Sequence, residues 1–283
     1  MSRRSLADAG IVLTGASSGI GRALAFALAE RGARLVIAAR RVPSLEEIAD
    51  RIELAGRTRP HVIEADLSRP GAAAGLAEKA TAALGRVQVL INNAGVGLVA
   101  GQGLVGDNEQ ARAVFETNLW SPVALTWSLL PDLRAERGLV VNVTSSLQSV
   151  PVPLLGYYGA SKAALAHLTR TLRHEVAGFG VSVLEYVPGA TDTDARDVGL
   201  LPWRNGPMRT PPPVSAESAA KAIVKAIERG ERRRVYPATS LLPLEIPAIG
   251  RLIAAIVTRR IDTGPTPTPG STPGSTMKTR TSP

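Results

Sequence analysis

Short apolar runs alternate with longer amphipathic segments along most of the chain. The apolar runs predict β-strands at residues 10–13, 34–39, 61–65, 87–91, 138–143 and 181–187. The other segments repeat apolar residues every three or four positions, which predicts helices at residues 22–31, 44–54, 70–83, 108–130, 157–177 and 215–229. Ser44 is expected to cap the second helix, because Glu47 stands three residues further on.

The predicted strands are almost continuously apolar, as in VQVLI (87–91) and LVVNV (139–143). Strands have this character when helices cover both faces of a parallel sheet. Alternation of strand and helix also indicates parallel β–α–β units with right-handed crossovers. We therefore expect an α/β fold, a doubly wound parallel sheet of the Rossmann type in a single domain, residues 1–262.

The C-terminal part of the chain has a different character. Residues 241–260 are largely apolar, and residues 249–260 have helical spacing, so we expect a C-terminal helical extension. Glu245 and Pro247 argue against a membrane span. Packing on the body or on a partner subunit is favoured over weak contact with a membrane surface, which stays open as the alternative. Residues 263–283 are rich in Pro, Gly, Ser and Thr and are expected to form a disordered tail.

Composition excludes several kinds of site and partner. The 283 residues contain no cysteine, which excludes disulfides and a cysteine nucleophile, and three scattered histidines give no reason to expect a metal site. The net charge is +9, but nine Lys/Arg against four Asp/Glu from Glu228 onward supply five of these charges. Because the basic character belongs to the C-terminal part, we expect no nucleic-acid partner. No long apolar run precedes the first glycine motif, which favours a cytoplasmic location, with membrane association as the alternative.

A glycine-rich turn, TGASSGIG at residues 14–21, stands where the first strand gives way to the first helix. Gly15 suits a tight turn, Gly19 lets the backbone approach a pyrophosphate, and Gly21 lets the helix pack near the sheet. The helix N-terminus then offers free N–H groups and the positive end of its dipole to phosphates. The spacing differs from the general dinucleotide fingerprint, and an ordinary turn explains the motif alone equally well. The turn residues expected at a cofactor are Gly15, Ser17, Ser18, Gly19, Ile20 and Gly21.

The end of the second strand indicates which dinucleotide binds. NAD(H) sites place an acidic residue here to hold the ribose hydroxyls, whereas this chain continues as Arg40-Arg41. The guanidinium of Arg40 can pair with a 2′-phosphate, so NADP(H) is preferred, and NAD(H) is the alternative. A solvated pair of arginines is the competing explanation. Asp66 and Leu67 are expected near the adenine ring, although a helix-capping role explains Asp66 almost as well.

Three residues, Ser145, Tyr158 and Lys162, indicate the chemistry. Tyr158 and Lys162 are four residues apart on a predicted helix and therefore share one face. An ammonium group beside a phenol favours the phenolate, so the tyrosine can give and take a proton near neutral pH. Ser145 ends the fifth strand, at the carboxyl edge where α/β sheets bind ligands, and its hydroxyl can bond a substrate oxygen. Asn118 falls within a predicted helix, where asparagine is unfavourable unless its side chain has a specific partner.

In order and approximate spacing, these motifs resemble the short-chain dehydrogenase/reductase family. The matching pieces are TGASSGIG (14–21), NNAG (92–95), Asn118, VNVTSS (141–146), YGASK (158–162) and PGATDT (188–193). They cover roughly residues 9–194, whereas the C-terminal third matches only in general style. A chance YxxxK pair on a helix surface is common, but the full ordered set is specific.

The resemblance implies a role for each matching residue. Tyr158 would be the catalytic acid/base, and Lys162 would assist it and hold the nicotinamide ribose. Ser145 would orient the carbonyl group, and Asn118 would hold a water in a proton relay behind Lys162. The other residues implied at the cofactor are Asn92, Ala94, Gly95, Pro188, Gly189, Thr191 and Thr193.

Two pairs of neighbours make the assignment ambiguous. Ser145 and Ser146 are adjacent, and the family's usual gap of thirteen residues before Tyr158 selects Ser145. Tyr157 and Tyr158 are also adjacent, and of these two Tyr158 has a lysine four residues later. Ser145 and Tyr158 are therefore the predicted pair.

The sequence thus predicts an NADP(H)-dependent oxidoreductase that interconverts a ketone or aldehyde and an alcohol. Residues 195–214 are expected to form a lid, whose apolar side chains either favour a hydrophobic substrate or simply pack the lid. An NADP(H)-binding regulatory protein without turnover, and an epimerase or dehydratase, are the alternatives. The resemblance implies a homodimer or homotetramer, with helices 108–130 and 157–177 at the interface.

Overall fold

The computed structural model describes residues 4–192, 201–206 and 212–263. These residues form a seven-stranded sheet in the order β3-β2-β1-β4-β5-β6-β9, with every neighbouring pair parallel. The strand order reverses between β1 and β4, the place where such sheets bind ligands outside their carboxyl ends. The strands are β1 (Gly10–Thr14), β2 (Arg34–Ala39), β3 (His61–Glu64), β4 (Val89–Asn92), β5 (Leu139–Val143), β6 (Ser182–Pro188) and β9 (Arg233–Tyr236).

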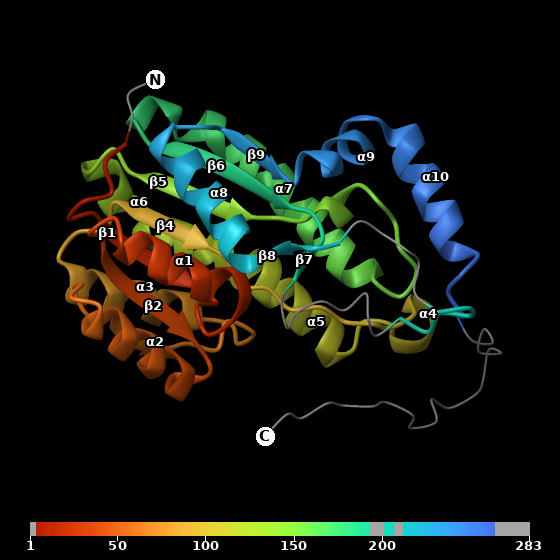
Figure 1. The fold of residues 1–283 in the computed structure, drawn as a ribbon, viewed down its shortest axis with the longest axis horizontal. Coiled ribbons are helices and arrows are strands. Elements are labelled where there is room, and N and C mark those ends of the chain that lie inside the picture. Colours follow the sequence, from red (N-terminus) through yellow and green to blue (C-terminus); the bar gives the residue numbers. More distant parts are fainter. Residues whose placement is uncertain (1–3, 193–200, 207–211, 264–283) are drawn as a thin grey trace.

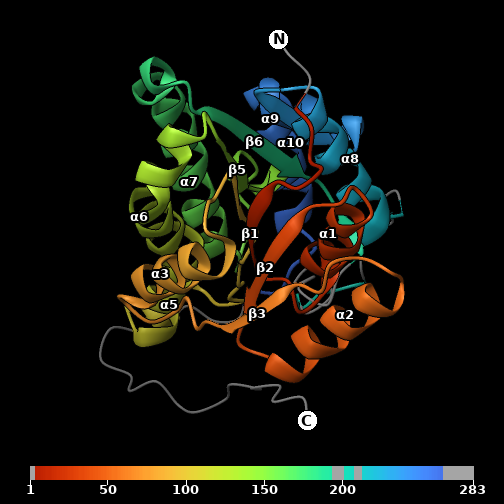
Figure 2. The same cartoon turned by 90° about the vertical axis from the view of Figure 1, so that its left-hand side faces the viewer.

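Helices cover both faces of this sheet, which confirms the predicted doubly wound α/β fold (Figure 2). On one face lie α1 (Gly19–Ala29), α2 (Val42–Leu54) and α8 (Ala216–Glu228), and on the other lie α3 (Ala72–Leu84), α6 (Ser121–Ala135) and α7 (Gly156–Glu175). Alternate strand residues supply the two cores: Ile11 and Leu13 belong to the first, and Val12 belongs to the second. Both strand faces are therefore apolar, which is why the strands read as continuous apolar runs.

The helix predicted at residues 108–130 is interrupted. It begins as α5 (Glu109–Phe115), capped by Asn108, whose side chain accepts the N–H of Ala111 at 2.9 Å. A π-helical turn, η1 (Glu116–Trp120), follows before α6 begins. Hydrophobic spacing does not reveal such a turn, because its extra residue changes the register only locally.

Two other elements differ from the sequence prediction. β9 was not expected, because arginines at 233 and 234 leave no apolar run, yet it pairs with β6 at the sheet edge. The prediction that Ser44 caps α2 was wrong: the helix begins at Val42 and has Pro43 in its first turn. Proline suits the first turn because the N–H groups there have no partner within the helix. The helix therefore starts before the serine.

The predicted C-terminal helical extension is present, and it lies beyond the carboxyl ends of the strands (Figure 1). It consists of α9 (Leu241–Glu245) and α10 (Pro247–Thr258), and α10 packs through Val257 into a small apolar cluster with Leu155 and Leu201. No single described helix is long and apolar enough to cross a membrane. Two consecutive segments, 238–245 and α10, reach that length and composition together, but they are bent by 101°. Residues 264–283 of the predicted tail lie outside the described residues.

Candidate active site

The glycine turn between β1 and α1 has positions that only glycine fits. Gly15 and Gly19 have φ angles of +66° and +52°, which side chains disfavour. A Cβ atom on Gly15 would lie 2.7 Å from Ala94 Cα, and one on Gly21 would lie 2.1 Å from Gly15 O. Ser18 precedes α1 without a side-chain capping bond. The turn therefore packs closely against the end of β4 and leaves the start of α1 open to a ligand.

Asn93 attaches the end of β4 to this turn, a contact that the predicted site did not include. Its Nδ2 donates to Thr14 O at 3.0 Å and to Gly15 O at 3.2 Å. Thr14 Oγ1 accepts the backbone N–H groups of Asn93 and Ala94. The NNAG motif offered a signal, because two adjacent amides at a strand end can bond neighbouring strands.

The side chain of Asn92 is buried between strands and a helix. It is 2% exposed, and its Nδ2 donates to Asn142 Oδ1 at 2.8 Å and to Thr126 Oγ1 at 3.3 Å. This buried amide joins β4 to β5 and α6. That Asn92 lines the cofactor stays a prediction, and its amide is occupied by these buried bonds.

Two arginines follow β2 beside the glycine turn. Arg40 is exposed, and Arg41 Nη2 donates to Ser17 Oγ at 3.2 Å. Sequence reasoning selected Arg40 and passed over Arg41, whose contact with the turn depends on how the loop folds. Both side chains are cationic and lie where the acidic residue of an NAD(H) site would stand.

Asp66 is tied into a turn of its own after β3. Its Oδ1 accepts from Ser68 N at 3.2 Å and from Ser68 Oγ at 2.7 Å, and Arg69 pairs with its Oδ2 at 3.2 Å. The Ser68 hydroxyl bond holds the pKa of Asp66 below its usual range, with help from Arg40. α3 starts after Gly71, so Asp66 does not cap it. Leu67 is buried, and its carbonyl accepts Ser121 Oγ at 2.8 Å.

Asn118 clamps the segment after β4 to α7. Its Oδ1 accepts Val96 N at 2.9 Å, and its Nδ2 donates to Val96 O at 2.9 Å and to Ser161 Oγ at 3.0 Å. Ser161 Oγ in turn donates to Tyr158 O at 2.8 Å. The asparagine is fully buried in the π-helical turn. Its side chain thus has specific partners that outweigh its low helix propensity.

Lys162, on α7, lies next to Asn118 and the segment after β4. Its Nζ donates to Val143 O at 2.9 Å, at the end of β5. A Cβ atom on Gly95 would lie 3.3 Å from this Nζ and 3.4 Å from Asn118 Oδ1, so the three residues converge. Burial lowers the pKa of Lys162 to about 8, which leaves the ammonium form dominant at neutral pH. Tyr158 stands one turn earlier on α7 and is half-buried.

Ser145 follows β5 and begins a short 3-10 turn, η2 (Ser146–Gln148). It is 6% exposed, and its Oγ accepts Leu147 N at 3.2 Å. Lys162 bonds the carbonyl of Val143, which stands two residues before Ser145 in the chain. β5 and η1 thus both bond α7, through Val143 with Lys162 and through Asn118 with Ser161.

The PGATDT segment leads away from β6 toward the C-terminal extension. A Cβ atom on Gly189 would lie 2.1 Å from Ser240 Oγ, so this glycine lets Ser240 approach after Pro188. Thr191 is 8% exposed, and its Oγ1 donates to Gly189 O at 3.3 Å. Thr193 lies outside the described residues.

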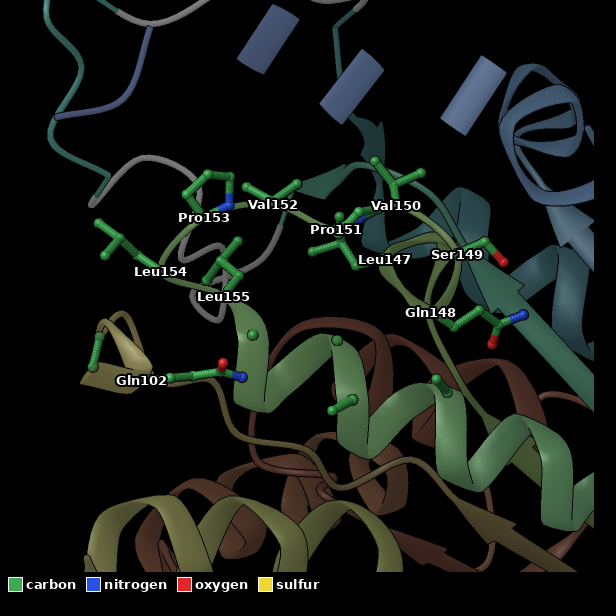
Figure 3. A pocket seen from close by; sticks show the side chains of 15 residues that line it. Gln102, Leu147, Gln148, Ser149, Val150, Pro151, Val152, Pro153, Leu154 and Leu155 are labelled. Carbon is green, nitrogen blue, oxygen red and sulfur yellow. The ribbon is translucent and has the colours of Figure 1, made fainter. Parts of the chain in front are cut away.

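An apolar pocket of about 590 Å³ lies between the segment after Ser145 and the first turns of α7, and its lining does not include Ser145, Tyr158 or Lys162 (Figure 3). The segment 147–155 arches over the first turns of α7, where Gly156, Gly159, Ala160 and Ala163 form the floor. Ala100 N donates to Leu154 O at 2.8 Å and joins this segment to the loop after β4. Small floor residues leave room beneath the segment for an apolar group. In the predicted lid, Leu201 is buried beside Leu155, and residues 195–200 and 207–211 lie outside the described residues.

Burial of Lys162 should make stability depend on pH. Its folded pKa, about 8, lies below its unfolded value of 10.5, so the unfolded chain binds more protons between these values and wild-type stability rises with pH. Relative to Lys162→Met, which lacks this titration, the wild-type free energy of unfolding should gain about 2 kcal/mol between pH 7.5 and 9.5. Urea denaturation of both proteins at the two pH values measures the difference between their free energies of unfolding. If this difference stays constant or falls as the pH rises, the Lys162 ammonium is not held in buried surroundings.

Comparison with known proteins identifies the class. The model of the short chain dehydrogenase family matches residues 9–198, so the chain belongs to this family and is an oxidoreductase. It is 36% identical over 245 residues to 11-beta-hydroxysteroid dehydrogenase A of Sesamum indicum, an alignment that covers 81% of this chain and 68% of that protein.

Solved structures agree with this assignment. A short chain dehydrogenase of Burkholderia cenocepacia in complex with NADP has a TM-score of 0.73 at 27% identity, covering 90% of this chain and 99% of its own. A short chain dehydrogenase/reductase of Burkholderia phymatum in complex with NAD has a TM-score of 0.76 at 25% identity, covering 95% and 100%. The family resemblance expected from the motifs is confirmed.

Proposed function

We propose that this protein is an NADP(H)-dependent oxidoreductase that interconverts a hydrophobic ketone or aldehyde and the corresponding alcohol. The observation that carries the proposal is the convergence of Lys162 Nζ, Asn118 Oδ1 and Gly95 at the carboxyl edge of the sheet. A buried ammonium at this place, one helical turn after Tyr158, has no evident use in a structural protein, because burying a charge is costly.

The chain has a cradle that fits a nicotinamide dinucleotide. The glycine turn leaves no room for side chains at Gly15 and Gly21, and the start of α1 offers N–H groups to a pyrophosphate. Arg40 and Arg41 supply cations for a 2′-phosphate, which favours NADP(H) over NAD(H). Asp66, Leu67, Ala94 and the PGATDT segment remain predicted contacts. When bound, the cofactor gives or takes the hydride.

The residues of the chain handle the oxygen and its proton. The Tyr158 hydroxyl donates a proton to the substrate oxygen during reduction and takes it back during oxidation. The Lys162 ammonium stabilises the phenolate that results. Ser145 donates a hydrogen bond to the same oxygen and orients it. Asn118 holds Ser161 and the segment after β4, and thereby fixes the helix that carries Tyr158 and Lys162.

A spectrophotometric screen tests this function directly. Oxidation of NADPH or NADH is followed with steroids, retinoids, fatty ketones and sugars as substrates. Turnover with a ketone supports the proposal. Tight NADPH binding without turnover on any substrate favours the regulatory alternative, and conversion of a nucleotide-sugar without net cofactor consumption favours an epimerase or dehydratase.

Apolar side chains in the segment that follows Ser145 favour a hydrophobic substrate. The segment 147–155 supplies apolar side chains at Leu147, Val150, Val152 and Leu154, and Leu155 joins them to Leu201 and α10. Large apolar ligands gain free energy in proportion to the area they bury. The name of the Sesamum indicum relative points to hydroxysteroids, which are rigid and apolar with hydroxyl groups at their edges, and we propose substrates of this kind.

We propose that the protein forms a homodimer through α6 and α7. Trp127 is 76% exposed and Trp120 55%, and they share one side of the η1–α6 segment with Val123, while Leu168 is exposed on α7. Large exposed aromatic side chains mark protein interfaces. Trp127→Lys is expected to convert the dimer into a monomer, measured by light scattering after size-exclusion chromatography. A wild-type protein that elutes as a monomer contradicts the proposal.

We also propose weak contact with an anionic membrane surface through α9 and α10. Leu242 and Leu252 are 56% and 61% exposed there, and no Asp or Glu lies between Glu245 and Asp262. An apolar face flanked by arginines binds anionic lipid surfaces, and the attraction weakens with salt. The protein should float with vesicles of anionic lipid at low salt, and Leu242→Ser with Leu252→Ser should remove this binding. If the protein stays in the soluble fraction under all conditions, the membrane contact is contradicted, and of the two predicted locations only the cytoplasm remains.

A further inference from the structure

A fully buried carboxylate lies next to the site without a role in it. Glu185 is in the middle of β6, with 0% of its surface exposed. Its neighbours Leu184 and Tyr186 belong to the core beneath α1 and α8, so Glu185 faces α7 on the other side of the sheet. Burying a charge is costly unless partners compensate it, so the partners of Glu185 show what it does.

The carboxylate connects four elements. Gln148 Nε2 donates to Oε1 at 3.1 Å, and Gln148 is the last residue of the η2 turn. On the other oxygen, Arg170 Nε of α7 lies at 3.6 Å and Arg233 Nε of β9 at 3.5 Å. Arg233 also pairs with Glu245 of α9. The two arginines supply the counter-charge, and Gln148 is the neutral partner.

This arrangement fixes both ends of the turn that carries Ser145. At its start, Thr144 N donates to Tyr186 O at 2.9 Å. At its end, Gln148 N donates to Ser145 O at 3.1 Å, and the Gln148 side chain bonds Glu185. Both attachments lead to β6, at the adjacent residues Glu185 and Tyr186. Without the second attachment, the turn would be held to β6 only where it begins.

We infer that Glu185, acting through Gln148, is a positioning residue for the Ser145 hydroxyl. The inference rests on the proposed function, in which that hydroxyl bonds the substrate oxygen. A charged acceptor makes the bond to Gln148 stronger than a neutral one would. Since hydrogen bonds to a reacting oxygen lose strength steeply with distance and angle, a loosened turn weakens catalysis more than cofactor binding.

Gln148→Leu tests the inference, because it removes the donor at similar volume and leaves the arginine pairs of Glu185 intact. We expect kcat to fall about tenfold with the KM for NADPH unchanged. In a Ser145→Ala background the same substitution should have no further effect on kcat, because the hydroxyl it positions is absent. Gln110→Leu, on the exposed side of α5, is the matched control and should match wild type in both backgrounds.

Hydrogen exchange supplies a readout that does not need turnover. The amides of Leu147 and Gln148, both bonded within the turn, should exchange about tenfold faster in Gln148→Leu and in Glu185→Gln. Equal loss of kcat in both backgrounds, unchanged kcat, or unchanged exchange overturns the inference. A wild-type protein without turnover refutes the proposed function instead, and the exchange rates then decide whether Glu185 holds the turn.

Discussion

Replacement of Tyr158 by phenylalanine is expected to reduce kcat about a thousandfold while the affinity for NADPH stays within about threefold of wild type. The variant removes one oxygen atom and with it the proton that the substrate oxygen receives in the proposed function. The ring remains, so α7 and the neighbouring Lys162 keep their packing. Single-turnover oxidation of NADPH measures the chemical step, and quenching of tryptophan fluorescence measures cofactor binding.

Tyr157→Phe is the matched control, one residue away on the same helix. The Tyr157 hydroxyl donates to Gly106 O, at the end of the short helix α4 (Gln102–Val105). Its loss should lower stability by about 1 kcal/mol and leave kcat close to wild type. If Tyr158→Phe turns over as fast as wild type, or if Tyr157→Phe is the inactive one, the assignment of the proton donor is wrong.

The second large effect is expected at the arginines that follow β2. Arg40→Ala combined with Arg41→Ala should raise the KM for NADPH about a hundredfold and leave the KM for NADH within about threefold. Each guanidinium can make charge-assisted bonds to a 2′-phosphate, a group that NADH lacks. The two single variants then show how the effect divides between Arg40 and Arg41, the residue that bonds Ser17.

Arg57→Ala is the control for net charge, because Arg57 is exposed in the loop after α2. It should change the KM of neither cofactor. A parallel loss for NADPH and NADH in the double variant would show that the arginines support the glycine turn and not the phosphate. An unchanged KM for NADPH would place the selectivity elsewhere.

Local sequence patterns were sufficient to predict most strands of the sheet and the order of the motifs. The apolar runs that became β1, β2, β4, β5 and β6 are long and buried on both faces, so the hydrophobic effect and β-propensity act in the same direction. β9 was not predicted because its arginines leave no apolar run, and the charge of Arg233 is compensated by Glu185 and Glu245 from other elements. A local sequence pattern does not predict a strand whose charged side chains form ion pairs with residues of other elements.

The candidate site shows the same division. Gly15, Gly21, Tyr158 and Lys162 could be predicted because a turn and a helix fix their spacing. Asn93, Arg41 and Glu185 were missed, since their hydrogen-bond partners lie 24 to 79 residues away in the chain. Hydrogen bonds between distant segments leave no periodic trace in a sequence.

The sequence by itself determined the doubly wound sheet, the glycine turn and the spacing of the tyrosine and lysine, because these follow from periodicity and local backbone conformation. Only the tertiary structure decided that Asn118 lies in a π-helical turn bonded to Ser161, and that a buried carboxylate on β6 accepts a hydrogen bond from Gln148 in the turn after Ser145. The reason is physical: hydrogen bonds form only when donor and acceptor lie within about 3 Å of each other. The partners of a side chain therefore depend on which segments the fold brings that close together.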